Sequence, residues 1–134
     1  MQLEEYIISL EKDAMARWQN GDPYGWIEIS DDNVVYIDPD LPAPIIGLEN
    51  LKKYYKQFEG KIYQYSEFIN PKVFCYGELA VLVYNYHSKV FDDSGILIRQ
   101  TLWNSTEVYC RIKESWKIVH THWSYIKGKK PNNN

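Results

Sequence analysis

The sequence has little cysteine, no excess of basic residues and no long apolar run. Its two cysteines, Cys75 and Cys110, fall in segments predicted as strands and suggest no disulfide framework, so a reducing compartment is the simplest expectation. The formal net charge of −3 leaves no basic footprint, so nucleic acid is not an expected partner. No window has the length of a membrane span, and the first residues lack the basic start of a secretory signal. We therefore expect a cytoplasmic protein with no membrane partner.

Aromatic side chains, in contrast, are abundant and make up 16% of the 134 residues. A chain of this length is typical of one domain, which buries about two thirds of its unfolded surface and needs no disulfide or metal to form a core. We expect a single domain over residues 1–126 and a polar, disordered tail over residues 127–134. Rings with polar tips suit a lined cavity or a half-buried interface, and they also suit an ordinary β core.

Helical spacing of apolar residues is found in the first half of the chain. Residues 3–18 follow an amphipathic pattern that ends near Gly21, because glycine commonly takes the left-handed position after a helix. Asp22 then caps a short second helix over residues 23–29, with Pro23 at its first position. The next segments are predicted as a turn over residues 30–33, a strand over 34–38, a proline-rich loop over 39–47 and a helix over 48–58.

The second half of the chain has the composition and punctuation of β-structure. The predicted strands cover residues 61–69, 72–76, 79–91, 96–113 and 116–126. Helices gathered at the front and a long antiparallel sheet behind them predict an α+β fold. A strongly bent sheet wrapped around these helices leaves a cone with a mouth, a place where ligands often bind.

Several short motifs follow one another in a characteristic order. They are Asp31-Asp32, the strand ending at Asp38-Pro39, Gly47 ahead of a helix with Tyr54-Tyr55, Asn70-Pro71, and a closing hairpin over residues 106–124. Their order and spacing resemble the nuclear transport factor 2-like superfamily, most closely its SnoaL-like branch near the association domain of calcium/calmodulin-dependent protein kinase II. The resemblance covers about residues 3–124. It implies a cystatin-like cone with N-terminal helices on a strongly curved, mainly antiparallel sheet, a deep pocket, and dimerisation through the outer sheet face.

The ketosteroid isomerase branch of the superfamily offers a catalytic template. The resemblance implies that Asp38 is a candidate general base, since a carboxylate there can move a proton next to a carbonyl if it is partly desolvated. Glu107 falls near the position of the acidic donor, so it is the candidate donor. The tyrosine that this branch needs on its first helix is replaced by Ala14, which is a clear departure. Asp38 has a second interpretation, in which it caps the strand-to-loop turn or pairs with an arginine.

The kinase association domain offers a second template, in which arginines line the pocket. Those positions carry Tyr86, Glu107 and Trp123 here, so a simple carboxylate is not the expected ligand unless Arg99 or Arg17 reaches the pocket. The same aromatic residues also suit a hydrophobic core or pocket wall, with their hydroxyls paired if buried. The residues expected to contact a ligand are Trp18, Tyr36, Leu51, Tyr84, Tyr86, Arg99, Trp103, Glu107 and Trp123.

The closing hairpin carries two histidines, His120 and His122, that alternation along a strand places on one face, with Trp123 on the other. Together with His87 they are one possible zinc site, although no carboxylate or cysteine of fitting spacing accompanies them. The resemblance places this face in a dimer interface, which is the interpretation we favour. The interface residues are then Asn85, Asn104, Thr106, His120 and His122.

Three functions therefore follow from the sequence. The leading hypothesis is a homodimeric SnoaL-like domain whose aromatic pocket binds a small molecule, with no cofactor and no metal. The second is a proton-transfer enzyme of the ketosteroid isomerase or polyketide cyclase kind, with Asp38 as its base. The third is a non-catalytic oligomerisation hub.

Overall fold

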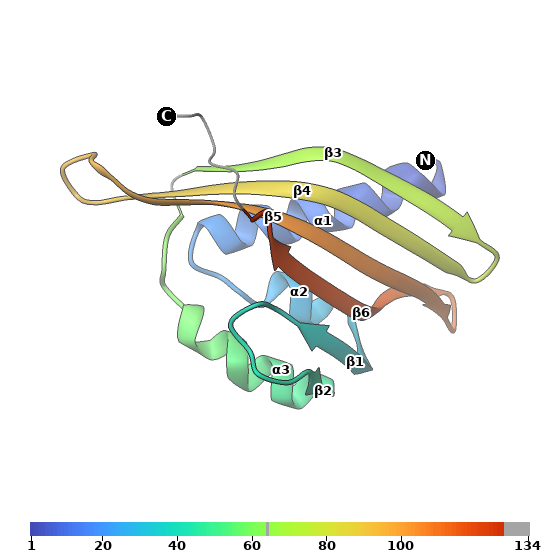
Figure 1. Ribbon diagram of the computed structural model, residues 1–134. Helices are drawn as coiled ribbons and strands as arrows, with labels where there is room; N and C mark the ends of the chain where they lie inside the picture. The colour runs from blue at the N-terminus through green and yellow to red at the C-terminus, as the bar shows by residue number, and fades with distance from the viewer. Residues whose placement is uncertain (64, 128–134) are drawn as a thin grey trace.

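A computed structural model describes residues 1–63 and 65–127 as three helices packed on one face of a curved sheet (Figure 1). The predicted tail over residues 127–134 lies outside this part of the chain, apart from Lys127. The six described strands follow the order β2-β1-β6-β5-β4-β3 across the sheet. The helices α1 and α2 lie behind the sheet in Figure 1, and α3 covers its β1 end. The predicted α+β class is confirmed.

The helices begin and end at local signals that the sequence contains. Helix α1 (Leu3–Gln19) starts with the Gln2 amide donating to Glu5 Oε1 at 3.0 Å, and it ends just before Gly21, whose φ of +88° suits a residue without a Cβ. Helix α2 (Gly25–Glu28) is shorter than the predicted segment 23–29. Helix α3 (Leu48–Tyr55) continues into a 3-10 turn, η1 (Lys56–Phe58). None of the described helices is long and apolar enough to cross a membrane.

Most strands pair with their neighbours in sequence, and all pairs are antiparallel except β1 with β6. Connections of a few residues join β3 to β4, β4 to β5 and β5 to β6, which is why these three pairs are antiparallel hairpins. The strands are β1 (Ser30–Ile37), β2 (Ile45–Ile46), β3 (Tyr65–Tyr76), β4 (Leu79–Phe91), β5 (Leu97–Ile112) and β6 (Ser115–Tyr125).

The strand β3 begins at Tyr65, later than the predicted start at residue 61, and the strands differ from the predicted ones in three further places. The turn expected over residues 30–33 belongs to β1, whose register to β6 shifts between Ser30 and Val35. The break expected at Asn70-Pro71 is a bulge inside the continuous strand β3, with Asn70 at a φ of +49°. The loop over residues 39–47 contains the two-residue strand β2, which pairs with β1. Local polarity and proline therefore predict breaks at positions where the sheet continues.

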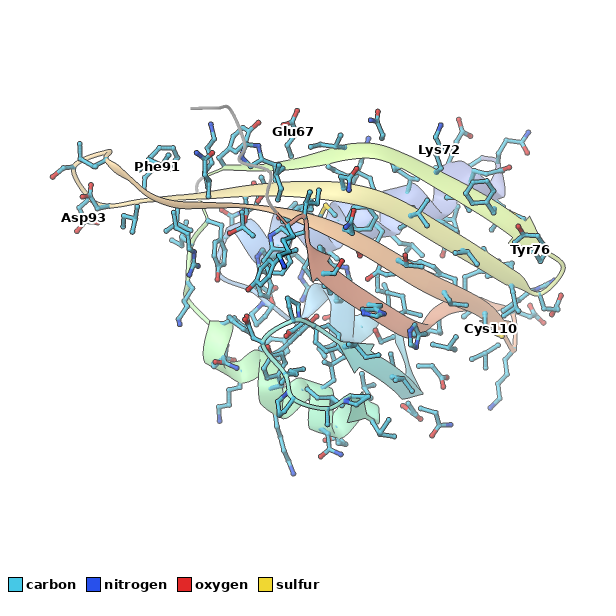
Figure 2. All side chains as sticks on the ribbon, in the orientation of Figure 1. Glu67, Lys72, Tyr76, Phe91, Asp93 and Cys110 are labelled. Atoms are coloured by element: carbon cyan, nitrogen blue, oxygen red, sulfur yellow. The ribbon has the colours of Figure 1, made fainter. Side chains whose placement is uncertain are left out.

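Alternation along the central strands separates an inner face, toward the helices, from an outer face. On β4 the side chains of Leu82, Tyr84 and Tyr86 are buried against the helices, whereas Val83 and Asn85 point to the outer face and are half-buried. Figure 2 shows Glu67 and Lys72 of β3 projecting on the side of the sheet away from the helices. The fold therefore leaves two surfaces for function: the space between helices and inner face, and the open outer face.

Candidate functional site

A cavity of about 400 Å³ lies between the helices and the inner face of the sheet, near the C-terminal ends of β1 and β6. Eleven of its seventeen described lining residues are aromatic. The lining residues are Trp18, Trp26, Tyr36, Asp38, Asp40, Tyr54, Tyr55, Phe58, Tyr63, Tyr86, Ser88, Arg99, Gln100, Thr101, Trp103, Trp123 and Tyr125. They come from α1, α2, α3, β1, β4, β5 and β6, so the cavity exists only in the folded chain.

The aromatic walls are built by rings that pack on one another. Trp18 stacks on Tyr63 with centroids 5.4 Å apart and planes 7° from parallel. On the sheet side Trp123 meets the rings of Tyr86 at 5.8 Å and Trp103 at 5.6 Å, both close to edge-to-face. Such pairs stabilise each other beyond their buried area and prefer defined relative orientations. The cavity is therefore bounded by aromatic side chains that support one another.

Asp38 provides a buried carboxylate on the cavity wall. Its Oδ2 accepts hydrogen bonds from the hydroxyls of Tyr36 at 2.9 Å and Tyr54 at 2.6 Å, and its Oδ1 accepts from the backbone N–H of Asp40 at 2.8 Å. Burial and the neighbouring Asp38 raise the pKa of both tyrosines above the ordinary value of 10.0, so both remain donors. Asp38 thus caps the turn after β1 and also lines the cavity.

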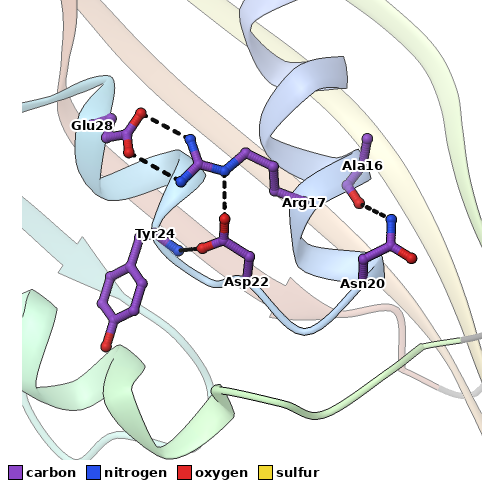
Figure 3. Close-up of polar contacts among 6 residues, drawn as sticks. All are labelled: Ala16, Arg17, Asn20, Asp22, Tyr24 and Glu28. Atoms are coloured by element: carbon purple, nitrogen blue, oxygen red, sulfur yellow. Dashed lines mark hydrogen bonds and ion pairs between the residues drawn. The ribbon is translucent and has the colours of Figure 1, made fainter.

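The sequence offers two arginines that could reach the pocket, Arg99 and Arg17. In the structure Arg99 lines the cavity and Arg17 does not. Figure 3 shows Arg17 held between two acids: its Nε donates to Asp22 at 2.7 Å, and its two terminal nitrogens donate to Glu28 at 2.8 and 3.0 Å. These bonds lower the pKa of Asp22 and Glu28. Arg17 therefore joins α1 to α2 on the surface.

Glu107, the candidate donor, lies in the interior behind the cavity wall. It is 1% exposed and sits beside Glu11 of α1, which is 0% exposed. Burial and the adjacent Glu11 raise the pKa of Glu107 well above the ordinary value of 4.5, which favours the protonated form of this carboxyl. Leu51 and Tyr84 are also core residues and do not line the cavity.

The structure thus brings together seven of the residues singled out for the pocket and adds others. Those that line the cavity are Trp18, Tyr36, Asp38, Tyr86, Arg99, Trp103 and Trp123. Sequence reasoning missed Tyr54, whose spacing of four residues to Phe58 on one helical side is a usable signal. It also missed Glu11, an acid inside the apolar stripe of Ile7 and Ala14.

The residues expected in a dimer interface all lie on the outer face, away from the cavity. Asn85 donates to Asn104 Oδ1 at 2.9 Å, and Thr106 is paired in register with His122. His120 lies near His122, with ring centroids 6.4 Å apart, and burial together with that neighbour lowers the pKa of His120.

His87 stands apart from these two histidines. Its Nε2 is hydrogen-bonded to Gln100 Oε1 at 3.2 Å, and its ring meets Tyr65 edge to face. Within the described part of the chain, no three His, Cys, Asp or Glu side chains come close enough to hold a metal ion. The three histidines are therefore not gathered into one zinc site.

Comparison with known proteins places this architecture. The chain matches the family model of the calcium/calmodulin-dependent protein kinase II association domain over residues 4–127. A solved structure from Parabacteroides distasonis, provisionally described as a ketosteroid isomerase, is 39% identical and superposes with a TM-score of 0.80, covering 95% of this chain and 90% of the other. Among the curated proteins, none matches this chain.

Two more distant structures share the fold. The association domain of Caenorhabditis elegans calcium/calmodulin-dependent protein kinase II is 21% identical with a TM-score of 0.75, over 90% of this chain and 93% of the other. A nuclear transport factor 2-like protein of unknown function from Pseudomonas putida is 21% identical with a TM-score of 0.79, over 96% of both chains. The chain belongs to the calcium/calmodulin-dependent protein kinase II association domain family, within the nuclear transport factor 2-like superfamily.

Proposed function

We propose that this chain is a homodimeric binding domain whose aromatic cavity takes a small organic molecule. The observation that carries the proposal is the cavity itself: its volume of about 400 Å³ falls in the range of small-molecule sites, and its walls combine eleven rings with a few polar groups. A cavity of this composition is built from residues far apart in sequence. Its polar atoms at Asp38, Thr101 and Arg99 supply the directional contacts that fix a ligand's orientation.

The outer sheet face supports the dimer. Val83, Asn85 and Thr106 are half-buried there although no described helix covers them, and their mixture of apolar and amide groups is typical of an interface. The relatives named as association domains make self-association the expected use of this face. Assembly above the dimer would indicate the alternative of an oligomerisation hub.

Native mass spectrometry of gently purified protein tests ligand and oligomer together. We expect a dimer that retains a reproducible non-protein mass. Thr101→Trp fills the cavity and should abolish the retained mass, whereas Ser94→Trp adds the same indole to the exposed β4–β5 turn and should leave it unchanged. A monomer contradicts the dimer. Equal retention by both variants, or no retained mass in the parent protein, contradicts the binding function.

A second candidate, proton transfer by Asp38, is favoured by the position of this carboxylate on the cavity wall and by the likeness to the Parabacteroides distasonis protein. Two features weigh against it. A Cβ at Gly25 would lie 2.8 Å from Ala14 Cα, so α1 and α2 are too close for a tyrosine at position 14, and Glu107 lies away from the cavity. Isomerisation of a β,γ-unsaturated ketone that is lost in Asp38→Asn would establish it.

A further inference from the structure

The charges on the cavity wall define a ligand class, an inference that rests on the proposed binding function. We infer that the cavity selects an organic cation, an amine or ammonium head on an apolar body. Its described lining residues include two carboxylates, Asp38 and Asp40, and one guanidinium, Arg99, with no lysine or histidine. The wall therefore carries a net negative charge among aromatic rings.

Asp38 is the stronger of the two carboxylates because it is buried. Its three donors, the hydroxyls of Tyr36 and Tyr54 and the backbone N–H of Asp40, are all neutral. Neutral donors replace water around the carboxylate but do not cancel its charge, and an unpaired charge is costly away from solvent. Within the part of the chain that the structure describes, Asp38 has no ion-pair partner. A positive ligand head supplies the missing charge.

The hydrogen-bond geometry leaves room for that head. A carboxylate offers about four acceptor positions, two on each oxygen. Oδ2 of Asp38 uses both of its positions on Tyr36 and Tyr54, whereas Oδ1 uses one on Asp40. Among the residues that the structure describes, none fills the second position on Oδ1, which is therefore open to an N–H of the ligand.

The other two charged residues of the cavity wall, Asp40 and Arg99, do not reverse the preference for a cation. Asp40 adds a second negative charge and accepts from the hydroxyl of Tyr125 at 2.9 Å, again a neutral donor. Arg99 is exposed, so solvent and salt screen its field, while the field of the buried Asp38 is screened less. The buried carboxylate thus dominates where a ligand head would sit.

The aromatic rings of the cavity wall also favour a cationic ligand. An aromatic face carries the negative part of the ring quadrupole and attracts a cation within about 6 Å of its centroid. In the Trp103–Trp123 and Tyr36–Tyr55 pairs the planes lie 80° and 88° apart, so the ring that presents its edge keeps both faces clear of that neighbour. The same faces disfavour an anionic head.

Three probes with one phenylbutyl body and different heads test the inference: 4-phenylbutan-1-amine, 4-phenylbutan-1-ol and 5-phenylpentanoate. Isothermal titration at neutral pH and moderate salt should show the amine binding about ten-fold tighter than the alcohol, with the carboxylate weakest. Asp38→Asn should weaken binding of the amine more than binding of the alcohol, so that the advantage of the amine is lost. Asp93→Asn, at the tip of the β4–β5 hairpin (Figure 2) and not among the described lining residues, should change none of the three.

The outcomes separate this inference from the binding function. An alcohol that binds parent protein and not Thr101→Trp supports the cavity as a site, and an amine no tighter than that alcohol then overturns the cationic ligand alone. A carboxylate that binds tightest overturns it as well. No binding by any probe contradicts both. If Asp38→Asn does not fold, Asp40→Asn gives the same comparison with a smaller loss expected.

Discussion

The indole Nε1 of Trp26 donates a hydrogen bond of 3.0 Å to Glu11 Oε1, which ties the cavity wall to a pair of buried acids. Glu11 also accepts from Tyr84 at 3.3 Å and from Tyr109. Glu107 lies beside it, and two carboxylates in one dry site cannot both ionise readily. Burial beside Glu11 therefore favours the protonated form of Glu107, whose pKa is raised.

Glu107→Gln should stabilise the protein increasingly as the pH rises. The raised pKa means that the folded state keeps a proton that the unfolded state releases above about 4.5, so unfolding becomes easier as the pH rises toward the folded pKa. Glutamine matches the protonated carboxyl in shape and does not titrate. The difference in the free energy of unfolding should shift in favour of the variant by about 1.4 kcal/mol per pH unit within that window.

Urea denaturation at one protein concentration from about pH 5 to about pH 8 measures this difference. Glu114→Gln, which removes an exposed carboxylate at the β5–β6 turn, provides the control and should give a small difference. A pH-independent difference for Glu107→Gln would show that Glu107 has the same charge folded and unfolded.

Gly25→Ala should destabilise the protein although alanine favours helices. Gly25 starts α2, where an added Cβ would lie 2.8 Å from the Cα and 3.2 Å from the Cβ of Ala14. The helices must separate to admit it, which costs about 1–3 kcal/mol, whereas helix propensity alone would gain up to about 1 kcal/mol. The midpoint of thermal unfolding shows directly whether the variant is less or more stable than the parent protein. A stabilised variant would show that α1 and α2 are free to move apart.

Much of the fold was predictable from sequence because its strongest periodic segments are also its longest elements. The predicted helix over residues 3–18 is α1, and the predicted strand over 79–91 is β4. At Asn70-Pro71, in contrast, the sequence predicts a break between two strands, whereas the structure has a bulge inside the single strand β3. Pro71 is tolerated because β3 is an edge strand, so its missing N–H costs few ladder bonds.

The site was predictable to the level of the sheet face and no further. Alternation places Tyr84, Tyr86 and Glu107 on the inner face, but whether a position meets cavity or core depends on how far α1 extends over it. Tyr84 and Glu107 lie under Glu11 of α1, whereas Tyr86, nearer the end of the sheet, reaches the cavity. Helix placement is a tertiary property that no strand pattern contains.

Arg17→Met should lower stability by about 1 kcal/mol at neutral pH, since the three charge-assisted bonds to Asp22 and Glu28 lie between largely exposed groups. The lowered pKa values of these acids mean that the stabilisation is present above their unfolded values near 4 and is lost as the pH falls through the folded values. Urea denaturation should therefore show parent and variant converging in acid.

Arg111→Met is the matched control for this surface ion pair. A terminal nitrogen of Arg111 lies 3.9 Å from a carboxylate oxygen of Glu78, also at the surface. This contact is looser than the three hydrogen bonds of Arg17 to Asp22 and Glu28. We expect a loss of less than about 0.5 kcal/mol. Equal losses in the free energy of unfolding for Arg17→Met and Arg111→Met would mean that the three hydrogen bonds of Arg17 add nothing beyond an ordinary surface charge.

Val83→Asp should convert the proposed dimer to a monomer. Val83 lies on the outer face opposite Thr106, and a carboxylate there would be buried without a partner if two sheets meet through this face. The cost of a few kcal/mol raises the dissociation constant by about 100-fold or more. Light scattering after size exclusion measures the mass at micromolar concentration. Lys53→Asp places the same carboxylate on the exposed side of α3 and should remain a dimer, so a dimeric Val83→Asp protein would locate the interface elsewhere.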